Sequence, residues 1–571
     1  MSRYSDLSGM SLNNAPVSEP ISEKQRPNLD GGSMSWKTDK WAQMRRFLIL
    51  GSDKNTYYAT ARKLTGINTT ALLECLDEDY ARYIDTLVEM RSGGIVPKYD
   101  TVRFALAIVY VKGSKKAKAY AKTRVTGILR TASDLEEWLS VLTGRVVGGE
   151  RSGYMRGWGR SVRGVCETWM RGRSLSSLVY QAIKYRNRAG MSFRNVVKLT
   201  HPHPGSDEAL SAVYYWIANG EPKPGFDYLA NKETSQIWAY ERIKRLNAYS
   251  EGDLTNIVEL INVYRLPWEA VPTDMLNNRD VLQVLSTHMP INATVRQLPR
   301  MTRVGMFDSP GFTRLITERL NNMEIVKSEN IHPLKLLQAY LTYKEGIGAS
   351  GKNPWKPSFD VVYALEQAFY TSFGTLEPTG LRRMQVIDVS GSMDGPLFSA
   401  WGTPRPGLRW QKGSFGNCSG LAGVTPREAA AALAMISVRT ESCSVMAFSN
   451  HVTQVYIRPG MTLDAVIAKF KAPYPGGTNM SLAIDTASRD GVEVDLFEIY
   501  TDNEANQGRH PAYALGEYQN KTGINAKAAF IAMVGYNDSV ADPDRGHDMM
   551  DFVGFDTTTP EMLRRFALGS F

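Results

Sequence analysis

The sequence predicts an α-solenoid followed by a doubly wound α/β domain. In residues 34–376, short amphipathic segments carry apolar residues three and four positions apart, which is the spacing of helices that bury one face. In residues 377–571, short apolar runs alternate with helical segments, which is the pattern of a mostly parallel sheet with helices on both faces. The chain has 571 residues, enough to bury a core in each part.

Three parts of the chain are distinguished by their composition. Residues 1–33 are polar and lack apolar periodicity, so we expect a disordered or loosely attached tail. Residues 34–376 show helical patterns without convincing alternating strands, which favours stacked helical hairpins. We find no strict repeat period, so any repeat is degenerate.

In the C-terminal part, the expected strands are residues 384–389, 443–448, 494–500 and 528–534. Helices are expected from Thr425 and after Asn479 and Pro511.

Cysteine usage and hydropathy exclude two classes of protein. The four cysteines, Cys75, Cys166, Cys418 and Cys443, have neither metal-ligand spacing nor the framework of a small secreted fold. No apolar stretch approaches the roughly 20 residues of a membrane span, and the N-terminus lacks a signal-peptide core. We therefore expect a reduced, cytoplasmic protein that does not enter the membrane.

Positive charge is concentrated in the helical part. Residues 1–380 contain 50 Lys and Arg against 38 Asp and Glu, whereas residues 381–571 contain 17 against 20. Residues 145–198 alone hold twelve basic residues and only two acids, Glu150 and Glu167. Such a density of positive charge is typical of a surface that binds a polyanion.

Helical spacing groups these basic residues into candidate contacts. We expect a helix from Leu175 to Gly190 that places Lys184 and Arg188 on one open face, and a second helix from Ser192 that stops at His201. The candidate RNA-binding residues of this pattern are Arg156, Arg160, Arg163, Lys184, Arg186, Arg188 and Lys198, and His201 is a loop residue near the same edge.

Trp158 and Trp169 lie among these basic residues, and interleaved basic and aromatic side chains suit single-stranded nucleic acid. The alternatives are that the cations form an ordinary solvated helix face, that His201 is structural and that both tryptophans belong to the core.

Oxygen-bearing side chains follow the ends of the predicted strands. Asp388, Ser390 and Ser392 follow the first strand, Thr478 follows a Gly-Gly turn, and Asp502 follows the strand ending near Tyr500. Because ligands of open α/β sheets bind at the carboxyl ends of the strands, these groups are expected to converge. Oxygen-only ligands with two carboxylates suit Mg²⁺ or another hard divalent cation. For Asp388, Ser390 and Ser392 taken alone, the alternative is an ordinary turn at the end of a strand, in which the serine side chains form hydrogen bonds with backbone groups.

The motifs DVSGS, GGT and TDNE resemble the metal-ion-dependent adhesion site of von Willebrand factor A domains. The resemblance implies that Asp388, Ser390, Ser392, Thr478 and Asp502 are metal ligands. This chain departs from the pattern by an inserted loop after Met393, which includes Trp401, Arg405, Arg409, Trp410 and Lys412.

Over nearly all of the chain beyond residue 33, the sequence resembles the Ro ribonucleoprotein autoantigen family, and a bacterial or phage-type member in particular. The matching segments are SWKTDKWAQMRRFLILGSDKNTYY, GWGR, KYRNRAGMSFRNVVKLTH, IHPLKLL and EPTGLRRMQVIDVSGSM, in that order. The resemblance implies a TROVE module of HEAT-like repeats, closed into a ring by a von Willebrand A domain.

The same resemblance implies a function. A basic outer surface would bind small Y RNA, and the ring cavity would take single-stranded 3′ ends of misfolded or defective non-coding RNA. Lys184, Arg188 and His201 would be RNA contacts, an exoribonuclease is an implied partner, and a closed ring favours a monomer.

The leading hypothesis is a non-catalytic RNA-binding protein for RNA quality control or decay. The alternative is a metal-dependent protein-interaction module in which the A domain grips an acidic partner. A Mg²⁺-dependent nuclease is disfavoured, because the sequence shows neither a second acidic cluster nor a positioned general base.

Overall fold

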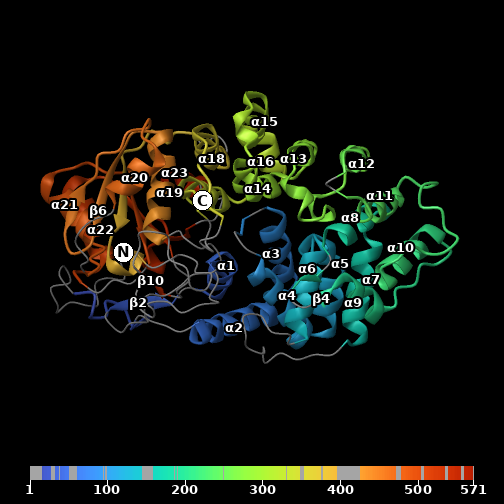
Figure 1. The fold of residues 1–571 in the computed structure, drawn as a ribbon. Helices are drawn as coiled ribbons and strands as arrows, with labels where there is room; N and C mark the ends of the chain where they lie inside the picture. Colours follow the sequence, from blue (N-terminus) through green and yellow to red (C-terminus); the bar gives the residue numbers. More distant parts are fainter. Residues whose placement is uncertain are drawn as a thin grey trace.

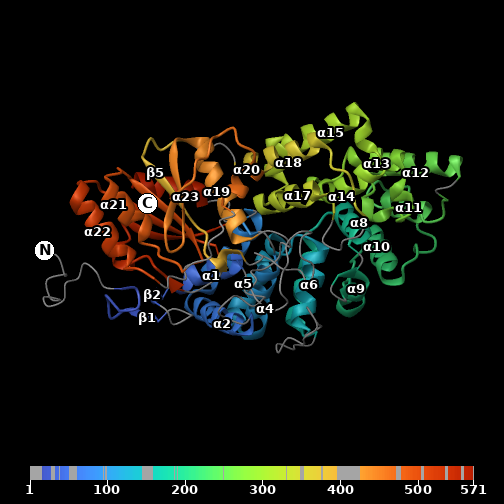
Figure 2. The ribbon, with the colours of Figure 1, turned by 60° about the vertical axis from the view of Figure 1, so that its left-hand side comes forward.

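Figures 1 and 2 show a computed structural model of the chain, in which a large helical domain lies beside a C-terminal α/β domain. The structure describes residues 16–27, 33–37, 39–50, 61–93, 95–96, 99–143, 158–185, 187–188, 191–247, 250–329, 331–347, 353–373, 377–394, 425–470, 477–502, 507–533, 538–554 and 559–569. Within these ranges no helix is long and apolar enough to cross a bilayer.

The helical domain is a curved stack of short helices (Figure 1). Its first half contains α1 (Lys40–Leu50), α2 (Ala61–Glu78), α3 (Tyr80–Ser92), α4 (Asp100–Lys112), α5 (Lys115–Ile128), α6 (Ala132–Leu142), α7 (Arg160–Arg171), α8 (Leu175–Lys184) and α9 (Phe193–Thr200). Its second half contains α10 (Glu208–Asn219), α11 (Ser235–Ile243), α12 (Glu251–Tyr264), α13 (Arg279–Ser286), α14 (Ile291–Arg303), α15 (Pro310–Asn321), α16 (Met323–Ser328), α17 (Pro333–Glu345) and α18 (Phe359–Thr371). The predicted α-solenoid is thereby confirmed.

The stack closes on itself. The His332 side chain, at the start of α17, bonds through Nε2 to the carbonyl of Ile95 at 3.0 Å, although 237 positions separate the two residues. Nearby, the Lys335 ammonium lies 5.5 Å from the centre of the Tyr99 ring. The end of the helical domain therefore returns to the segment between α3 and α4.

The C-terminal domain is built on a six-stranded sheet with the order β11-β9-β8-β5-β6-β7, and the predicted doubly wound architecture is confirmed. The strands are β5 (Arg383–Asp388), β6 (Cys443–Phe448), β7 (Val452–Gln454), β8 (Leu496–Thr501), β9 (Lys527–Ala532) and β11 (Met549–Val553). All neighbours are parallel except the edge strand β7, which pairs antiparallel with β6. The edge strands β7 and β11 were not predicted from the sequence.

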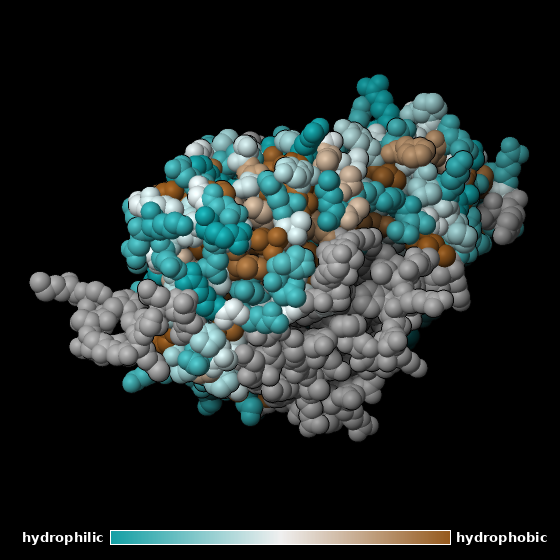
Figure 3. Space-filling model, turned by 90° about the vertical axis from the view of Figure 1, so that its left-hand side faces the viewer, coloured by the Kyte–Doolittle hydropathy of each residue, from teal (hydrophilic) through white to brown (hydrophobic). Residues whose placement is uncertain are grey.

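Helices cover both faces of this sheet. They are α19 (Pro426–Thr440), α20 (Leu463–Lys469), α21 (Leu482–Asp490), α22 (Pro511–Thr522) and α23 (Thr559–Leu568). Alternate strand residues point to opposite faces, so Ile387 joins the core shared with α19 and α20 while Val386 joins the core of α21 and α22. Figure 3 shows that hydrophilic residues dominate the visible described surface of this side.

Part of the expected tail is an ordered component of the C-terminal domain. Strand β1 (Gln25–Pro27) pairs with β2 (Met34–Lys37), which in turn pairs with β10 (Asp538–Ser539). Val17 is buried in the core of α21 and α22. The expectation of a loosely attached tail is therefore wrong for residues 16–27, because strand pairing and one buried apolar side chain hold them. Residues 1–15 lie outside the described residues.

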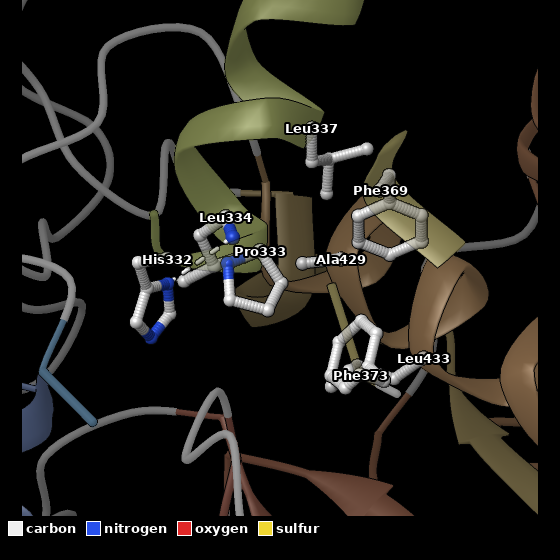
Figure 4. Close-up of a pocket in the computed structure, with 8 residues that line it drawn as sticks. All are labelled: His332, Pro333, Leu334, Leu337, Phe369, Phe373, Ala429 and Leu433. Atoms are coloured by element: carbon white, nitrogen blue, oxygen red, sulfur yellow. Dashed lines mark hydrogen bonds between the residues drawn. The ribbon is translucent and has the colours of Figure 1, made fainter. Parts of the chain in front are cut away.

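The contacts that join the domains include a dense apolar one and a buried ion pair. At the first, Pro333 and Leu337 of α17 and Phe369 of α18 pack against Ala429 and Leu433 of α19 around a void of only about 10 Å³ (Figure 4). One continuous hydrophobic core therefore runs from the helical domain into the sheet.

At the second contact, Arg46 of α1 reaches Asp551 of β11, with 3.2 Å between Nη2 and Oδ1. Burial raises the pKa of Asp551 to about 6, while the Arg46 charge opposes this rise.

We expect Arg46→Ala to lower the free energy of unfolding by about 3–5 kcal/mol at pH 7, because it leaves the Asp551 carboxylate buried without its cation. The loss should shrink as the pH falls through about 6, where Asp551 becomes protonated and its buried charge disappears. Denaturant unfolding at several pH values measures both effects.

The matched control is Arg45→Ala, which removes a half-exposed cation paired with Glu89 at 3.6 Å and should cost at most about 1 kcal/mol. Equal losses for the two variants, or a loss for Arg46→Ala that does not change with pH, would contradict this role for the Arg46 pair.

Candidate functional site

Two carboxylates meet at one edge of the central sheet. Asp388 ends β5, and Asp502 follows the neighbouring parallel strand β8, whose Tyr500 is in register with Ile387. Thr478 lies just before α21. All three predicted ligands are buried, with side chains at most 2% exposed. The strand ends therefore bring together groups that lie up to about 110 positions apart, as the parallel sheet predicts.

Hydrogen bonds fix the Asp388 carboxylate. Its Oδ1 accepts from the backbone N–H of Ser390 at 2.8 Å, and its Oδ2 accepts from the Thr501 hydroxyl at 2.9 Å. Burial raises the pKa of Asp388, and these hydrogen bonds act in the opposite direction. Behind the loop, Arg427 donates to the carbonyls of Val389 and Ser390 at 2.6 and 3.1 Å, which holds the strand-end turn in place.

These residues fit a hard divalent cation. Asp388 and Asp502 supply carboxylate oxygens, and Ser390 and Thr478 supply hydroxyls, which is the all-oxygen chemistry that Mg²⁺ prefers. The described ranges contain no cluster of three or more His, Cys, Asp or Glu side chains, so a cation here would depend on hydroxyl oxygens as well as on the two carboxylates. The backbone of Ser392 lies in a 3-10 turn after the site, but its side chain is outside the described residues, as is the inserted loop with Trp401, Arg405, Arg409, Trp410 and Lys412.

Four predicted RNA contacts lie exposed on α7, on α9 and at the C-terminal cap of α9. Arg160 and Arg163 are on α7, Lys198 is on α9, and His201 caps the end of α9 in the left-handed conformation with φ 47°. Since α7 packs against α9, these four residues belong to neighbouring helices. Arg156 and Arg186 lie outside the described residues, and of Arg188 only the backbone, in β3 (Asn187–Arg188), is described.

Lys184 ends its helix, so the expected helix to Gly190 is wrong. The backbone of Tyr185 is extended at φ −117° and ψ 94°, and the chain then forms the short hairpin of β3 with β4 (Met191–Ser192). Arg188 thus does not share a helical face with Lys184. The Lys184 ammonium instead lies 5.4 Å and 5.5 Å from the ring centres of Tyr180 and Tyr185.

Trp169, one of the two tryptophans among these cations in the sequence, belongs to the core. Trp169 is fully buried, packs edge-on against Phe193 with 5.8 Å between ring centres, and donates to the Leu129 carbonyl at 2.5 Å. Trp158 is partly buried against the same core. The prediction that these rings stack on bases is therefore wrong for Trp169, since no face is open to a base.

The closure of the helical domain creates a second group of cations, the central cation cluster, which consists of Arg91, Arg103, Arg296 and Lys335. Asp134 binds Arg91 at 2.9 Å and Arg103 at 2.8 Å. The Arg91 guanidinium lies 3.7 Å from the centre of the Tyr99 ring, and Lys335 approaches the same ring. These residues come from α3, α4, α14 and α17, so no local sequence spacing could have revealed the cluster.

Lys335 is the member of this cluster whose positive charge is least favourable in the folded protein. Burial lowers the pKa of its ammonium to about 8, and the positive charges of Arg296 and Arg91 lower it further. In the part of the chain that the structure describes, neither Lys335 nor Arg296 forms an ion pair. Asp100, Asp134 and Glu137 pair with Arg103, and Asp134 also pairs with Arg91. The positive charge that an anion would relieve is therefore that of Lys335 and Arg296.

Comparison with known proteins agrees with both the fold and the order of the domains. Residues 28–342 match the model of the TROVE domain, and residues 412–567 match that of the Ro60 vWA domain. The RNA-binding protein RO60 of Deinococcus radiodurans is 30% identical over 562 residues, covering 97% of this chain and 98% of the relative. The RNA-binding protein RO60 of Caenorhabditis elegans is 27% identical and covers 96% of this chain. The crystal structure of the Deinococcus radiodurans RO (RSR) protein superposes with a TM-score of 0.65 at 29% identity and covers 93% of this chain.

We expect Lys335→Met to raise the free energy of unfolding at pH 7 by up to about 3 kcal/mol, because a lysine whose pKa falls from 10.5 to about 8 on folding destabilises the native state whenever it is charged. The gain in unfolding free energy over the wild type should be largest below pH 8, where Lys335 is charged in the folded wild-type protein. The gain should fall to roughly half by pH 9.5, where Lys335 is protonated only in the unfolded state. Urea unfolding at both pH values tests this, and a gain that does not depend on pH would contradict it.

Proposed function

The chain belongs to the Ro60 family, since its TROVE match covers more than half of its length, and we propose that it is an RNA-binding protein. The central cation cluster is the observation that carries the proposal, because Lys335 and Arg296, which form no ion pair with any described residue, lie where the two ends of the helical domain meet. Phosphates of a single strand would relieve the repulsion between these cations. The similarity to proteins named RNA-binding protein RO60 supports the same function.

In this proposal the two basic regions have different RNA ligands. The central cation cluster takes single-stranded 3′ ends of misfolded or defective RNA, and the exposed face with Arg160, Arg163, Lys198 and His201 takes small structured Y RNA. Recognition rests on phosphate charge and backbone shape rather than on base edges, which is usual for structured RNA. The protein would act without catalysis in RNA quality control or decay, as a cytoplasmic monomer that hands RNA to an exoribonuclease.

We further propose that Asp388, Ser390, Ser392, Thr478 and Asp502 hold Mg²⁺. The ion would supply a positive charge that fixes the loops at the carboxyl edge of the sheet. The Asp388 carboxylate is oriented by hydrogen bonds from the Ser390 N–H and the Thr501 hydroxyl. Arg427 stabilises the strand-end turn by donating to the carbonyl of Val389. This geometry favours a binding or structural metal.

We expect Mg²⁺ or Mn²⁺ to raise the melting temperature of the metal-depleted protein and Asp388→Asn to abolish the rise, because ion binding to the folded state alone adds stability. Thermal melting with a metal titration measures the effect. The control is Asp485→Asn, which removes an Asp in the same domain that pairs with Arg509 and should leave the rise intact. A metal response that persists in Asp388→Asn would disprove the assigned site.

The RNA proposal is tested with a hairpin that carries or lacks a single-stranded 3′ tail, in a salt titration with and without EDTA. We expect binding that falls steeply with salt and does not respond to EDTA, and a preference for the tail that Lys335→Met removes. Arg160→Ala combined with Arg163→Ala should weaken binding to the hairpin and reduce the slope of log affinity against log salt by about two, one for each exposed cation lost.

Arg458→Ala combined with Lys469→Ala is the matched control, since it removes two exposed cations from the C-terminal domain. It should leave the slope unchanged. If the wild-type protein has no affinity for RNA at low salt but captures an acidic protein in an EDTA-sensitive manner, the metal-dependent protein-interaction module would replace the RNA-binding proposal.

A further inference from the structure

Residues 16–19, here called the N-terminal strap, lie against residues 507–510, which lead into α22. Pro16 and Arg509 form an antiparallel bridge, and the Val17 N–H donates to the Gly508 carbonyl at 2.9 Å. These are contacts between backbone groups, so they do not depend on the charged side chain of Arg509. The Val17 side chain is buried in the core of α21 and α22. The strap is therefore attached both by its backbone and by one apolar side chain.

The side chain of His510 adds a further hydrogen bond to the strap. Its Nε2 lies 2.7 Å from the Glu19 carbonyl, and because a carbonyl can only accept, this nitrogen carries the proton and donates. The imidazole is buried and meets the rings of Trp36 and Tyr513 edge to face, with 6.3 and 6.2 Å between ring centres. These contacts hold the imidazole in the orientation that reaches the strap.

The segment 507–510 also contacts the loop that carries the predicted metal ligand Thr478. The Gln507 N–H donates to the Thr478 carbonyl at 3.2 Å. Gly508, at φ 80°, lies so close to the Asn479 side chain that a Cβ atom at this position would have no room. One short segment therefore contacts the strap and also Thr478 and its neighbour.

The three predicted ligands on this edge differ in how the fold places them. Asp388 ends β5 and Asp502 follows β8, and these two strands are paired in the sheet. Thr478 instead lies in the loop before α21, so its position depends on the segments packed against that loop. The contacts of segment 507–510 thus act on the ligand that the sheet itself does not fix.

We propose that the N-terminal strap positions Thr478 for the divalent cation, an inference that rests on the proposed metal site. Val17 and His510 are positioning residues, which act through segment 507–510 and do not touch the ion. Partners that orient a metal ligand from behind typically change metal affinity by about 10- to 100-fold. Affinity for the cation should therefore depend on a segment more than 450 positions away from Thr478 in the sequence.

Binding of Mn²⁺ to the 571-residue chain tests the proposal, measured by isothermal titration calorimetry well below the melting temperature. His510→Phe keeps a ring of similar size but removes the donor to Glu19, and we expect it to weaken Mn²⁺ binding by about tenfold. His510→Gln offers an amide N–H₂ at a similar reach and should restore most of the affinity. Val17→Ala should weaken binding in the same direction as His510→Phe.

Val494→Ala is the matched control for Val17→Ala. Both substitutions shorten a buried valine of the same core of α21 and α22. Val494, however, precedes β8 and lies at the opposite end of this strand from Asp502. We expect both variants to lower the melting temperature, because each leaves a cavity, and only Val17→Ala to weaken Mn²⁺ binding.

The outcomes separate this inference from the proposed metal site. If the wild-type protein binds Mn²⁺ and both His510→Phe and Val17→Ala bind it with unchanged affinity, the strap serves stability alone and the inference is overturned. Equal weakening in Val494→Ala and Val17→Ala would overturn it as well, since the effect would then follow general loss of stability. If the wild-type protein does not bind Mn²⁺, the proposed metal site itself fails. If His510→Phe does not fold, the comparison of the two valine variants still decides.

Discussion

The arrangement of the whole chain depends on the apolar contact between α17 and α18 of the helical domain and α19 of the C-terminal domain. Leu337, Phe369 and Leu433 pack around a void of only about 10 Å³, so this contact is nearly as dense as a protein interior. It directs the start of α17 back toward the first helices, where His332 bonds to Ile95. Without this return, Lys335 and Arg91 would lie on opposite ends of an open stack and no central cation cluster would exist.

The sequence was most informative where local pattern and topology agree. The parallel strands are continuous apolar runs because both of their faces are buried. The start of α19 can be recognised in the sequence from the capping box formed by Thr425 and Glu428. The convergence of Asp388 and Asp502 follows from the same logic, since adjacent parallel strands end at one edge. The strands and the approach of Asp388 to Asp502 at one edge of the sheet could therefore be predicted together.

Features that depend on distant pairing could not be predicted in this way. The segment 16–27 has no apolar periodicity, and its order comes from pairing of β1 with β2 and from burial of Val17 in a distant core. The helix expected to reach Gly190 ends at Lys184, because the hairpin of β3 and β4 supplies competing backbone hydrogen bonds that helical spacing cannot anticipate. The central cation cluster could not be predicted for the same reason, because its members come from four separate helices.

Burial of Lys335 links the architecture to the proposed RNA binding. A lysine whose pKa is lowered to about 8 makes the native state less stable at neutral pH, and a phosphate beside it would recover part of that stability. The same closure that buries Lys335 also sets its distance from Arg91 and the Tyr99 ring. A loosened contact between α17 and α19 would hydrate the ammonium, raise its pKa and weaken the local attraction for phosphate. In the proposed function, the stability of the domain contact and the affinity for a single-stranded end are therefore coupled through one side chain.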